Sequence, residues 1–207
     1  MIPADGMARL GTETAFEVLA RANALAAEGR QIINLGIGQP DFKTPPHIVE
    51  AGAKALMDGH HGYTDARGIV PLRESVARYL ETYNKVKVDP DQVVVVPGGK
   101  VTMWFAIMMF GQPGVDILYP NPGFPIYESA INYTGARAVP IELHEETGFS
   151  LNAEEVLAKL TPATRLIIVN TPANPTGGAI DKKELDTLAA GLADRPDIAI
   201  LSDEIYS

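Results

Sequence analysis

Glycine, asparagine, aspartate and tyrosine gather in four short segments that each follow a run of apolar residues. The segments are residues 97–100, 121–124, 170–177 and 203–206. The apolar runs have the length and composition of buried strands. In an open sheet of parallel strands, ligands bind in the crevice beyond the carboxyl ends of the strands. The four segments therefore predict one shared small-molecule site.

The first segment has the features of a phosphate site. Gly98, Gly99 and Lys100 stand between an apolar run and an apolar helix, where unpaired N–H groups and a cation favour an anion. A Walker A loop is excluded, because it needs glycine at Val94 and serine or threonine at Val101. An ordinary strand-to-helix turn remains the alternative.

Asp203 ends an apolar strand, where a carboxylate is costly unless a positive charge or hydrogen bonds compensate it. A cationic partner would make Asp203 functional, whereas a turn or cap residue at a solvated sheet edge is the alternative. Taken alone, Asn174 lies in a turn sequence and Phe124 reads equally well as a core residue.

The elements that must position these segments alternate along the second half of the chain. Helices are expected at residues 14–28, 45–58, 71–83, 126–133, and onward from 100, 152 and 181, and strands at 93–96, 116–119, 138–141, 165–169 and 198–201. Glu155 and Glu184 follow the expected cap residues Asn152 and Asp181 at the capping-box offset. Strands without alternation predict a three-layer α/β/α fold with a mostly parallel sheet, preceded by a helical N-terminal arm.

Composition narrows the class of protein. The 207 residues are 46% hydrophobic and 21% charged, which is typical of a globular domain with a sizeable core. The formal net charge of -9 argues against nucleic-acid and anionic-membrane partners. No cysteine is present, and the four histidines lack ligand spacing, so neither disulfides nor a metal site are expected.

The sequence indicates neither secretion nor a membrane-spanning helix. Its first ten residues contain no apolar stretch of signal-peptide length. The longest apolar stretch, residues 101–110, is far shorter than the roughly 20 residues of a membrane-spanning helix. A cytoplasmic location without a membrane partner is therefore expected.

Taken together, the segments resemble the class I/II aminotransferases, the fold-type I enzymes that use pyridoxal 5'-phosphate. The motifs LGIGQPDF, GYTDARG, VPGGK, YPNPGF with Tyr127, VNTPANPTG and SDEIY run in unbroken order from residue 35 to residue 206. By this resemblance, residues 1–44 are an N-terminal arm and the start of a small domain. Residues 45–207 are the first part of the large cofactor-binding domain.

The resemblance implies a role for most of the unusual residues. Gly99, Lys100 and Val101 would contact the cofactor phosphate, and Phe124 would lie on the face of the pyridine ring. Asp203 would pair with the pyridine nitrogen and keep it protonated, so that the ring withdraws electrons from the substrate carbanion. Asp203 is thus the first expected catalytic residue.

Further implied contacts involve the substrate and a second subunit. Asn174 and Tyr206 would contact the phenolic oxygen of the ring, Asn174 would also face the substrate, and Tyr206 is the second expected catalytic residue. The backbone at Ile37 and Gly38 would contact the substrate carboxylate. Tyr63 would reach the cofactor phosphate of a neighbouring subunit, which implies a homodimer.

The resemblance also implies cis peptide bonds before Pro122 and Pro175. It places the lysine that binds the cofactor covalently, and the arginine that binds the substrate carboxylate, beyond the motifs found here. Lys54 and Lys100 lack the serine-rich approach of that lysine. We therefore expect these 207 residues alone not to transfer amino groups between an amino acid and a 2-oxo acid.

Several readings stay open. A lyase, decarboxylase or synthase could use the same fold and cofactor. A regulator with an aminotransferase-like sensor domain would need a basic DNA-binding module ahead of the motifs, and a fragment that only folds or binds is a third alternative. By the same resemblance, Lys100 stands where some aspartate-type and diaminopimelate-type members of the family carry lysine, which hints at a substrate with an acidic side chain. Aromatic and alanine-type substrates stay open.

Overall fold

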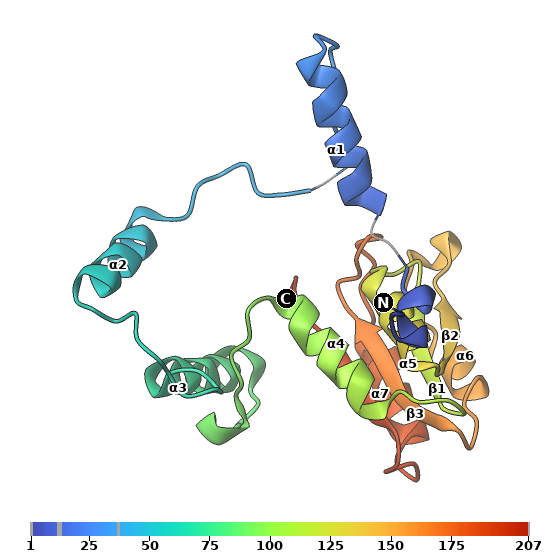
Figure 1. Cartoon of the computed structure of the whole chain (residues 1–207). Helices are drawn as coiled ribbons and strands as arrows, with labels where there is room; N and C mark the ends of the chain where they lie inside the picture. The colour runs from blue at the N-terminus through green and yellow to red at the C-terminus, as the bar shows by residue number, and fades with distance from the viewer. Residues whose placement is uncertain (1, 12–13, 37, 207) are drawn as a thin grey trace. The chain divides into compact units, whose positions relative to one another are not determined.

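The computed structural model describes residues 2–11, 14–36 and 38–206 (Figure 1). The chain divides into two compact units, Met1–Glu13 with Gly98–Ser207 and Thr14–Pro97. Each unit is described by itself. This division falls elsewhere than the expected boundary between residues 44 and 45, which stays a prediction.

The first unit contains a four-stranded sheet. Its strands are β1 (Asp116–Asn121), β2 (Arg137–Glu142), β3 (Thr164–Asn170) and β4 (Ala199–Asp203). They lie in the order β2-β1-β3-β4, and all three pairings are parallel. The four strands confirm the expected strands from residue 116 onward and the parallel α/β fold.

Helices cover both faces of this sheet (Figure 1). On one face, α4 (Gly99–Phe110) and α5 (Ile126–Thr134) contribute Ile107, Tyr127 and Ile131 to a core with Ile117 and Leu166. The other face carries α6 (Ala153–Ala158) and α7 (Lys182–Gly191). Its core is made of Leu118, Ile141, Leu151, Val156, Ile167, Val169 and Leu188, together with Leu143 and Ala153. The expected three-layer arrangement is therefore confirmed.

Strand alternation explains why the runs in the sequence look apolar without interruption. Ile117 and Leu166 face the α4 and α5 side, whereas the next residues along the same strands, Leu118 and Ile167, face the α6 and α7 side. Successive side chains of a strand point to opposite faces, and here both faces are buried. A run such as residues 166–169 therefore has no polar positions to mark its period.

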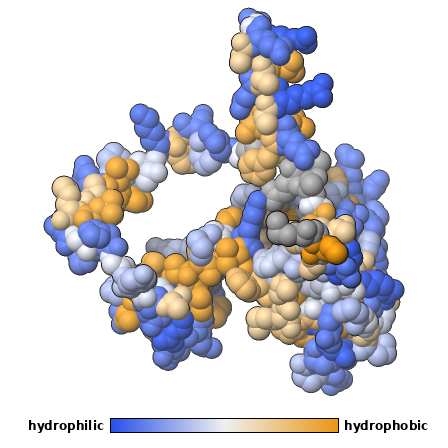
Figure 2. Space-filling model, in the orientation of Figure 1, coloured by the Kyte–Doolittle hydropathy of each residue, from blue (hydrophilic) through white to orange (hydrophobic). Residues whose placement is uncertain are grey.

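The second unit consists of helices and connecting segments. It contains α1 (Thr14–Ala27), α2 (Pro46–Met57) and α3 (Val70–Tyr79), followed by a π-helical turn (Leu80–Asn84) and a 3-10 turn (Pro90–Gln92). Figure 2 shows apolar side chains on the surfaces of these helices, and Phe16, Val18, Leu56 and Met57 are among the exposed ones. Within their own unit, these helices bury few apolar side chains.

The strand expected at residues 93–96 does not form among the described residues. Val94 is 58% exposed. The Val93 N–H donates to the Pro90 carbonyl at 3.2 Å and the Val95 N–H to the Arg67 carbonyl at 2.9 Å, and neither bond belongs to a strand ladder. A strand forms when a neighbouring strand satisfies its row of backbone N–H and C=O groups. The β-branched residues 93–96 favour extended backbone, but no neighbouring strand pairs with them among the described residues.

The helix starts follow the expected caps only in part. Asn152 caps α6 by accepting the Glu155 N–H at 3.0 Å, as expected. Asp181 is the N-cap residue of α7, as expected, but its side chain makes no cap bond there. The Glu184 carboxylate instead accepts the Ala153 N–H at 2.7 Å. A residue of α7 thus satisfies a donor in the first turn of α6, and this contact fixes the two helices to each other.

Among the helices described, none is long and apolar enough to cross a membrane. The most apolar of them, α4, has 12 residues.

The amino-terminal end of the sheet is held by a buried carboxylate. Asp116 starts β1 and accepts two bonds from the Arg137 guanidinium, at 2.7 and 2.5 Å, and one from the Thr161 hydroxyl at 2.6 Å. These donors hold the pKa of Asp116 below its usual range, with the Arg137 bond as the largest cause. The cluster connects β1, β2 and the segment that leads into β3.

We expect Asp116→Asn to lower the free energy of unfolding by about 1–2 kcal/mol at neutral pH, because an amide is uncharged and cannot make the charge-assisted bonds. The loss stays this small because the Arg137 side chain is largely exposed to water. The folded pKa lies below the unfolded value. The contribution is therefore complete above about pH 4 and is lost as pH falls through the folded pKa.

Urea unfolding at a series of pH values measures both effects. Asp186→Asn, which removes one partner of an exposed pair with Lys182, is the matched control and should change stability by less than about 0.5 kcal/mol. A gap between Asp116→Asn and the wild type that stays constant down to pH 2 would contradict this assignment.

Candidate active site

Six of the expected site residues lie around one cavity of about 220 Å³ at the carboxyl end of the sheet. The cavity is lined by Gly99, Lys100, Met103, Phe124, Asn174, Asp203, Ile205 and Tyr206. The lining residues come from the start of α4, the β1–α5 connection, the β3–α7 connection and the segment after β4. Segments more than a hundred residues apart in the sequence thus meet at one place, although the run before the first of them, residues 93–96, forms no strand.

Backbone amides are available where α4 begins. Gly98 precedes the helix with a φ of 91°, which L side chains rarely adopt, and a Cβ at Gly98 would meet nothing within 4 Å. Among the described residues, no side chain caps this helix. The N–H groups of a first helical turn have no partner within the helix, and the helix dipole favours an anion there. The start of α4 is therefore suited to an anionic group.

Val101 sits slightly apart from the other expected residues. Its N–H donates to the Gly98 carbonyl at 3.3 Å. Its side chain lines an adjoining apolar cavity of about 260 Å³, together with Lys100, Trp104, Phe105 and Ile126. Lys100 borders both cavities.

An aromatic ring forms another part of the cavity lining. The Lys100 ammonium lies 5.6 Å from the centre of the Phe124 ring, within the range of a cation–π contact. The Phe124 ring meets the Tyr127 ring edge to face, at a centroid distance of 5.9 Å and an angle of 90°. Tyr127 therefore fixes the ring of Phe124 from behind.

Asp203 is held by two side chains whose role the sequence had not revealed. The Tyr127 hydroxyl donates to the Asp203 carboxylate, and the Asn170 amide donates to the Asp203 carbonyl at 2.9 Å. The Asn170 side-chain oxygen accepts the Asn174 N–H at 2.7 Å. Asn170 therefore connects the loop of Asn174 to the strand end that carries Asp203.

The sequence contained only weak indications of the roles of Tyr127 and Asn170. Asn170 is the last residue of β3, and in the folded sheet it is the register partner of Asp203 at the end of β4. Tyr127 lies three residues after Phe124 and is fully buried, although a tyrosine of α5 could equally have packed in the core without a polar contact. Placement at a strand end could have indicated Asn170, whereas only the folded arrangement reveals the partner of Tyr127.

Burial controls the protonation of both tyrosines beneath this edge. The pKa of Tyr127 is raised far above its usual value, mainly by burial and further by its bond to Asp203. Burial likewise raises the pKa of Tyr119 to about 12, with Glu128 adding to the effect. Tyr127 is consequently a permanent hydrogen-bond donor toward Asp203 at physiological pH.

The two expected cis peptide bonds, Asn121–Pro122 and Asn174–Pro175, are confirmed. A third, Thr171–Pro172, was not expected.

Two expected residues belong to the second unit. Tyr63 is fully exposed and lines a cavity of about 670 Å³ between the end of α2 and the start of α3. Gly38 is exposed in a connecting segment that is neither helix nor strand. Ile37 lies outside the described residues. The roles expected for Gly38 and Tyr63 stay predictions.

Comparison with known proteins decides the family. The family model for aminotransferase class I and II matches residues 30–207. The chain belongs to this family. Membership implies a transferase that uses pyridoxal phosphate, in agreement with the motifs and with the fold.

Individual relatives differ in substrate. The chain is 36% identical over 98% of its length to a probable aspartate/prephenate aminotransferase from Aquifex aeolicus, covering 51% of that protein. It is 35% identical over 93% of its length to the arginine–pyruvate transaminase of Pseudomonas aeruginosa, covering 49% of that protein. The chain thus spans about half the length of these relatives.

A solved structure agrees with the fold. The aspartate aminotransferase of Thermus thermophilus, determined with maleate, matches the whole chain with a TM-score of 0.94 and 31% identity. The match covers 54% of that structure.

We expect Tyr127→Phe to lower the free energy of unfolding by about 1–2 kcal/mol at neutral pH, because the Asp203 carboxylate loses a donor. The folded pKa of Tyr127 is raised, so its contribution is complete below about pH 10, the unfolded value, and is lost as pH rises above it. The wild type should therefore lose stability more steeply above pH 10 than the variant.

Urea unfolding between pH 7 and alkaline pH tests this. Tyr83→Phe is the matched control, since Tyr83 is 71% exposed, and it should follow the wild type throughout. Equal stability of Tyr127→Phe and the wild type at neutral pH would show that the hydroxyl makes no stabilising bond.

Proposed function

We propose that this chain forms the cofactor-binding half of a pyridoxal-phosphate-dependent aminotransferase that moves an amino group from an L-amino acid to a 2-oxo acid. The observation that carries the proposal is the cavity in which the Asp203 carboxylate, the Phe124 ring and the start of α4 meet. Family membership supports the reaction class. Because the chain spans half of its relatives, the activity of the whole protein is part of the proposal.

The residues present fit this cofactor. Gly98 leaves open space before the first turn of α4, where N–H groups suit a phosphate. Phe124 offers an aromatic surface of the kind that holds a flat ring. Asp203 offers a carboxylate oxygen, which suits a protonated pyridine nitrogen. The cavity thus supplies an anion site, an apolar surface and a counter-charge, one for each part of the cofactor.

The roles of the residues follow from these chemistries. Gly99, Lys100 and Val101 would hold the phosphate, and Phe124 would orient the ring. Asp203 would keep a proton on the ring nitrogen. Bound pyridoxal phosphate supplies an electron-withdrawing ring that stabilises negative charge at the α-carbon of an amino acid.

The remaining donors act around Asp203 and the far side of the ring. The Tyr127 hydroxyl orients the carboxylate through the bond described above, and Asn170 fixes the backbone of the same residue. Asn174 and Tyr206 line the cavity and would contact the phenolic oxygen, with Asn174 also facing the substrate. Their side chains can donate hydrogen bonds to an oxygen that carries negative charge.

The proposal includes a second subunit and a location. Tyr63 would contact the phosphate bound by a partner in a homodimer, and the backbone at Gly38 would contact the substrate carboxylate. Residues 1–44 would form the arm and the start of a small domain, with residues 45–207 as the first part of the large domain. A cytoplasmic location is part of the same proposal.

Asp203→Ala should weaken pyridoxal phosphate binding by about tenfold or more and change the absorbance spectrum of the bound cofactor, because the ring nitrogen loses its counter-charge. Absorbance titration of the wild type and the variant measures both. Asp186→Ala, on the exposed face of α7, is the control and should bind like the wild type. Equal affinity and equal spectra for Asp203→Ala would remove the basis of the proposal.

We propose that the amino-acid substrate carries an acidic side chain. Lys100 borders both cavities, and its ammonium lies over the Phe124 ring. Aspartate/prephenate specificity in a relative agrees with this class, whereas arginine specificity in another shows how the family varies.

Lys100→Met should lower the affinity of the cofactor-loaded chain for succinate at least about fivefold more than for butyrate, since one charge contact is worth about 1 kcal/mol. Isothermal titration with the two acids measures this ratio. Lys54→Met, on the exposed surface of α2, serves as the control. An unchanged ratio in Lys100→Met would exclude the acidic subsite.

A further inference from the structure

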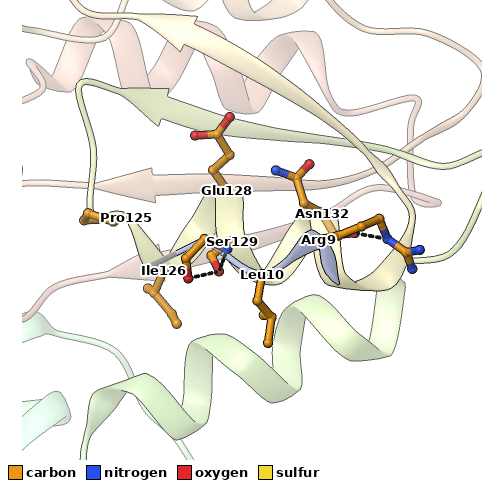
Figure 3. Close-up of a pocket in the computed structure, with 8 residues that line it drawn as sticks. Arg9, Leu10, Pro125, Ile126, Glu128, Ser129 and Asn132 are labelled. Atoms are coloured by element: carbon orange, nitrogen blue, oxygen red, sulfur yellow. Dashed lines mark hydrogen bonds between the residues drawn. The ribbon is translucent and has the colours of Figure 1, made fainter. Parts of the chain in front are cut away.

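The first described residues form a strap across α5, outside the cavity that the proposed function uses. Figure 3 shows Arg9 and Leu10 lying along this helix, beside Ser129 and Asn132. The strap comprises residues 4–11, including a 3-10 helix (Asp5–Arg9). We define it by these residues because each of its anchors to α5 falls within them.

One anchor is the guanidinium of Arg9. Its Nε donates to the Asn132 carbonyl and its terminal nitrogen to the Tyr133 carbonyl, both at 2.8 Å. These carbonyls belong to the last turn of α5, where the helix dipole is negative. The Asn132 carbonyl also accepts the Gly135 N–H at 3.1 Å. Arg9 therefore caps the carboxyl end of α5 with a cation from a segment more than a hundred residues away.

A second anchor joins Gly11 to Ser129 in both directions. The Gly11 N–H donates to the Ser129 hydroxyl oxygen at 2.9 Å, and that hydroxyl donates to the Gly11 carbonyl at 3.3 Å. Between the anchors, the strap and α5 leave a groove of about 490 Å³ (Figure 3). The strap is thus fixed at separate points, so a single substitution can release one of them.

The third anchor reaches α4 through an aromatic pair. Gly6 is buried, and a Cβ at that position would approach the Tyr133 ring to 2.9 Å. The same ring packs against Trp104 of α4, with a centroid distance of 5.0 Å. Tyr133, a residue of α5, therefore contacts both the strap and α4.

Both helices begin at the cavity. α4 starts at Gly99 and α5 at Ile126, two residues after Phe124 and one residue before Tyr127. A helix transmits a displacement of one end to the other because its backbone is internally hydrogen-bonded. Contacts at Asn132 and Tyr133 therefore restrain the position of the Tyr127 hydroxyl at the opposite end of the same nine-residue helix.

We propose that the strap is a positioning element of the active site, in which Arg9 and Gly6 fix α5 against α4 and thereby hold the Tyr127 hydroxyl on the Asp203 carboxylate. Its effect on cofactor binding rests on the proposed function, whereas its effect on Tyr127 does not.

The first test needs no cofactor. In Arg9→Met, which keeps an unbranched side chain but removes the donors, the 13C signal of the Tyr127 ring carbon bonded to oxygen should shift. Amide exchange along α5 should become faster by about fivefold or more. Tyr127→Phe assigns the signal, and Arg30→Met, at an exposed arginine of the second unit, is the matched control. An unmoved Tyr127 signal in Arg9→Met would overturn the proposal.

The second test separates positioning from general stability. Arg9→Met should weaken pyridoxal phosphate binding about fivefold in the wild type but less than about twofold in the Tyr127→Phe background, since the variants act through one contact. An equal loss of pyridoxal phosphate affinity in both backgrounds would show that the strap acts on general stability and not through Tyr127, and would overturn the proposal. Absence of cofactor binding in the wild type would refute the proposed function, while the Tyr127 signal still decides the role of the strap.

Discussion

The hydrogen bond from Tyr127 to Asp203 is the interaction on which the cavity depends. A carboxylate at the end of an apolar strand must be compensated, and the nearest element that can supply a donor is the helix packed on that face of the sheet. Tyr127 is fully buried, so its hydroxyl is not accessible to water and donates to the Asp203 carboxylate instead. The hydrogen bond restrains both groups. The carboxylate that faces the cavity is thereby fixed from the core side, which leaves its remaining acceptor capacity directed toward a ligand.

The two ends of the sheet use buried polar groups for different purposes. At the amino end, Asp116 is surrounded by Arg137 and Thr161, which satisfy both of its carboxylate oxygens from within the chain. At the carboxyl end, Asp203 receives one strong donor from Tyr127 and a long contact of 3.4 Å from the Ile205 N–H. A carboxylate that is saturated by protein donors stabilises the fold, and one with free acceptor capacity beside a cavity can bind a ligand cation.

The sequence predicted the sheet and the gathering of the site because both follow from local pattern. Apolar runs locate β1, β3 and β4, and parallel topology brings the residues after them to one edge. It did not predict that residues 93–96 lack strand pairing, that Glu184 would cap a neighbouring helix, or that Tyr127 would reach Asp203. Each of these three features depends on a partner that is distant in the sequence. The type of a side chain does not indicate which distant group it will contact in the fold. Propensity reports what a segment can form, and pairing depends on what lies beside it.

The strap illustrates why such contacts cluster on helices that begin at a cavity. The start of a helix can present unpaired amides or side chains to a ligand only if its other end is fixed, because a nine-residue helix on a sheet face can slide and rotate as a unit. In α5 the buried face is occupied by Tyr127, Ala130 and Ile131, which oppose rotation through packing against the sheet. Packing of apolar side chains is non-directional, so it restrains sliding along the axis less than hydrogen bonds to the terminal carbonyls do. Arg9 supplies those directional bonds at the end farthest from Asp203, where they can fix the helix without entering the site.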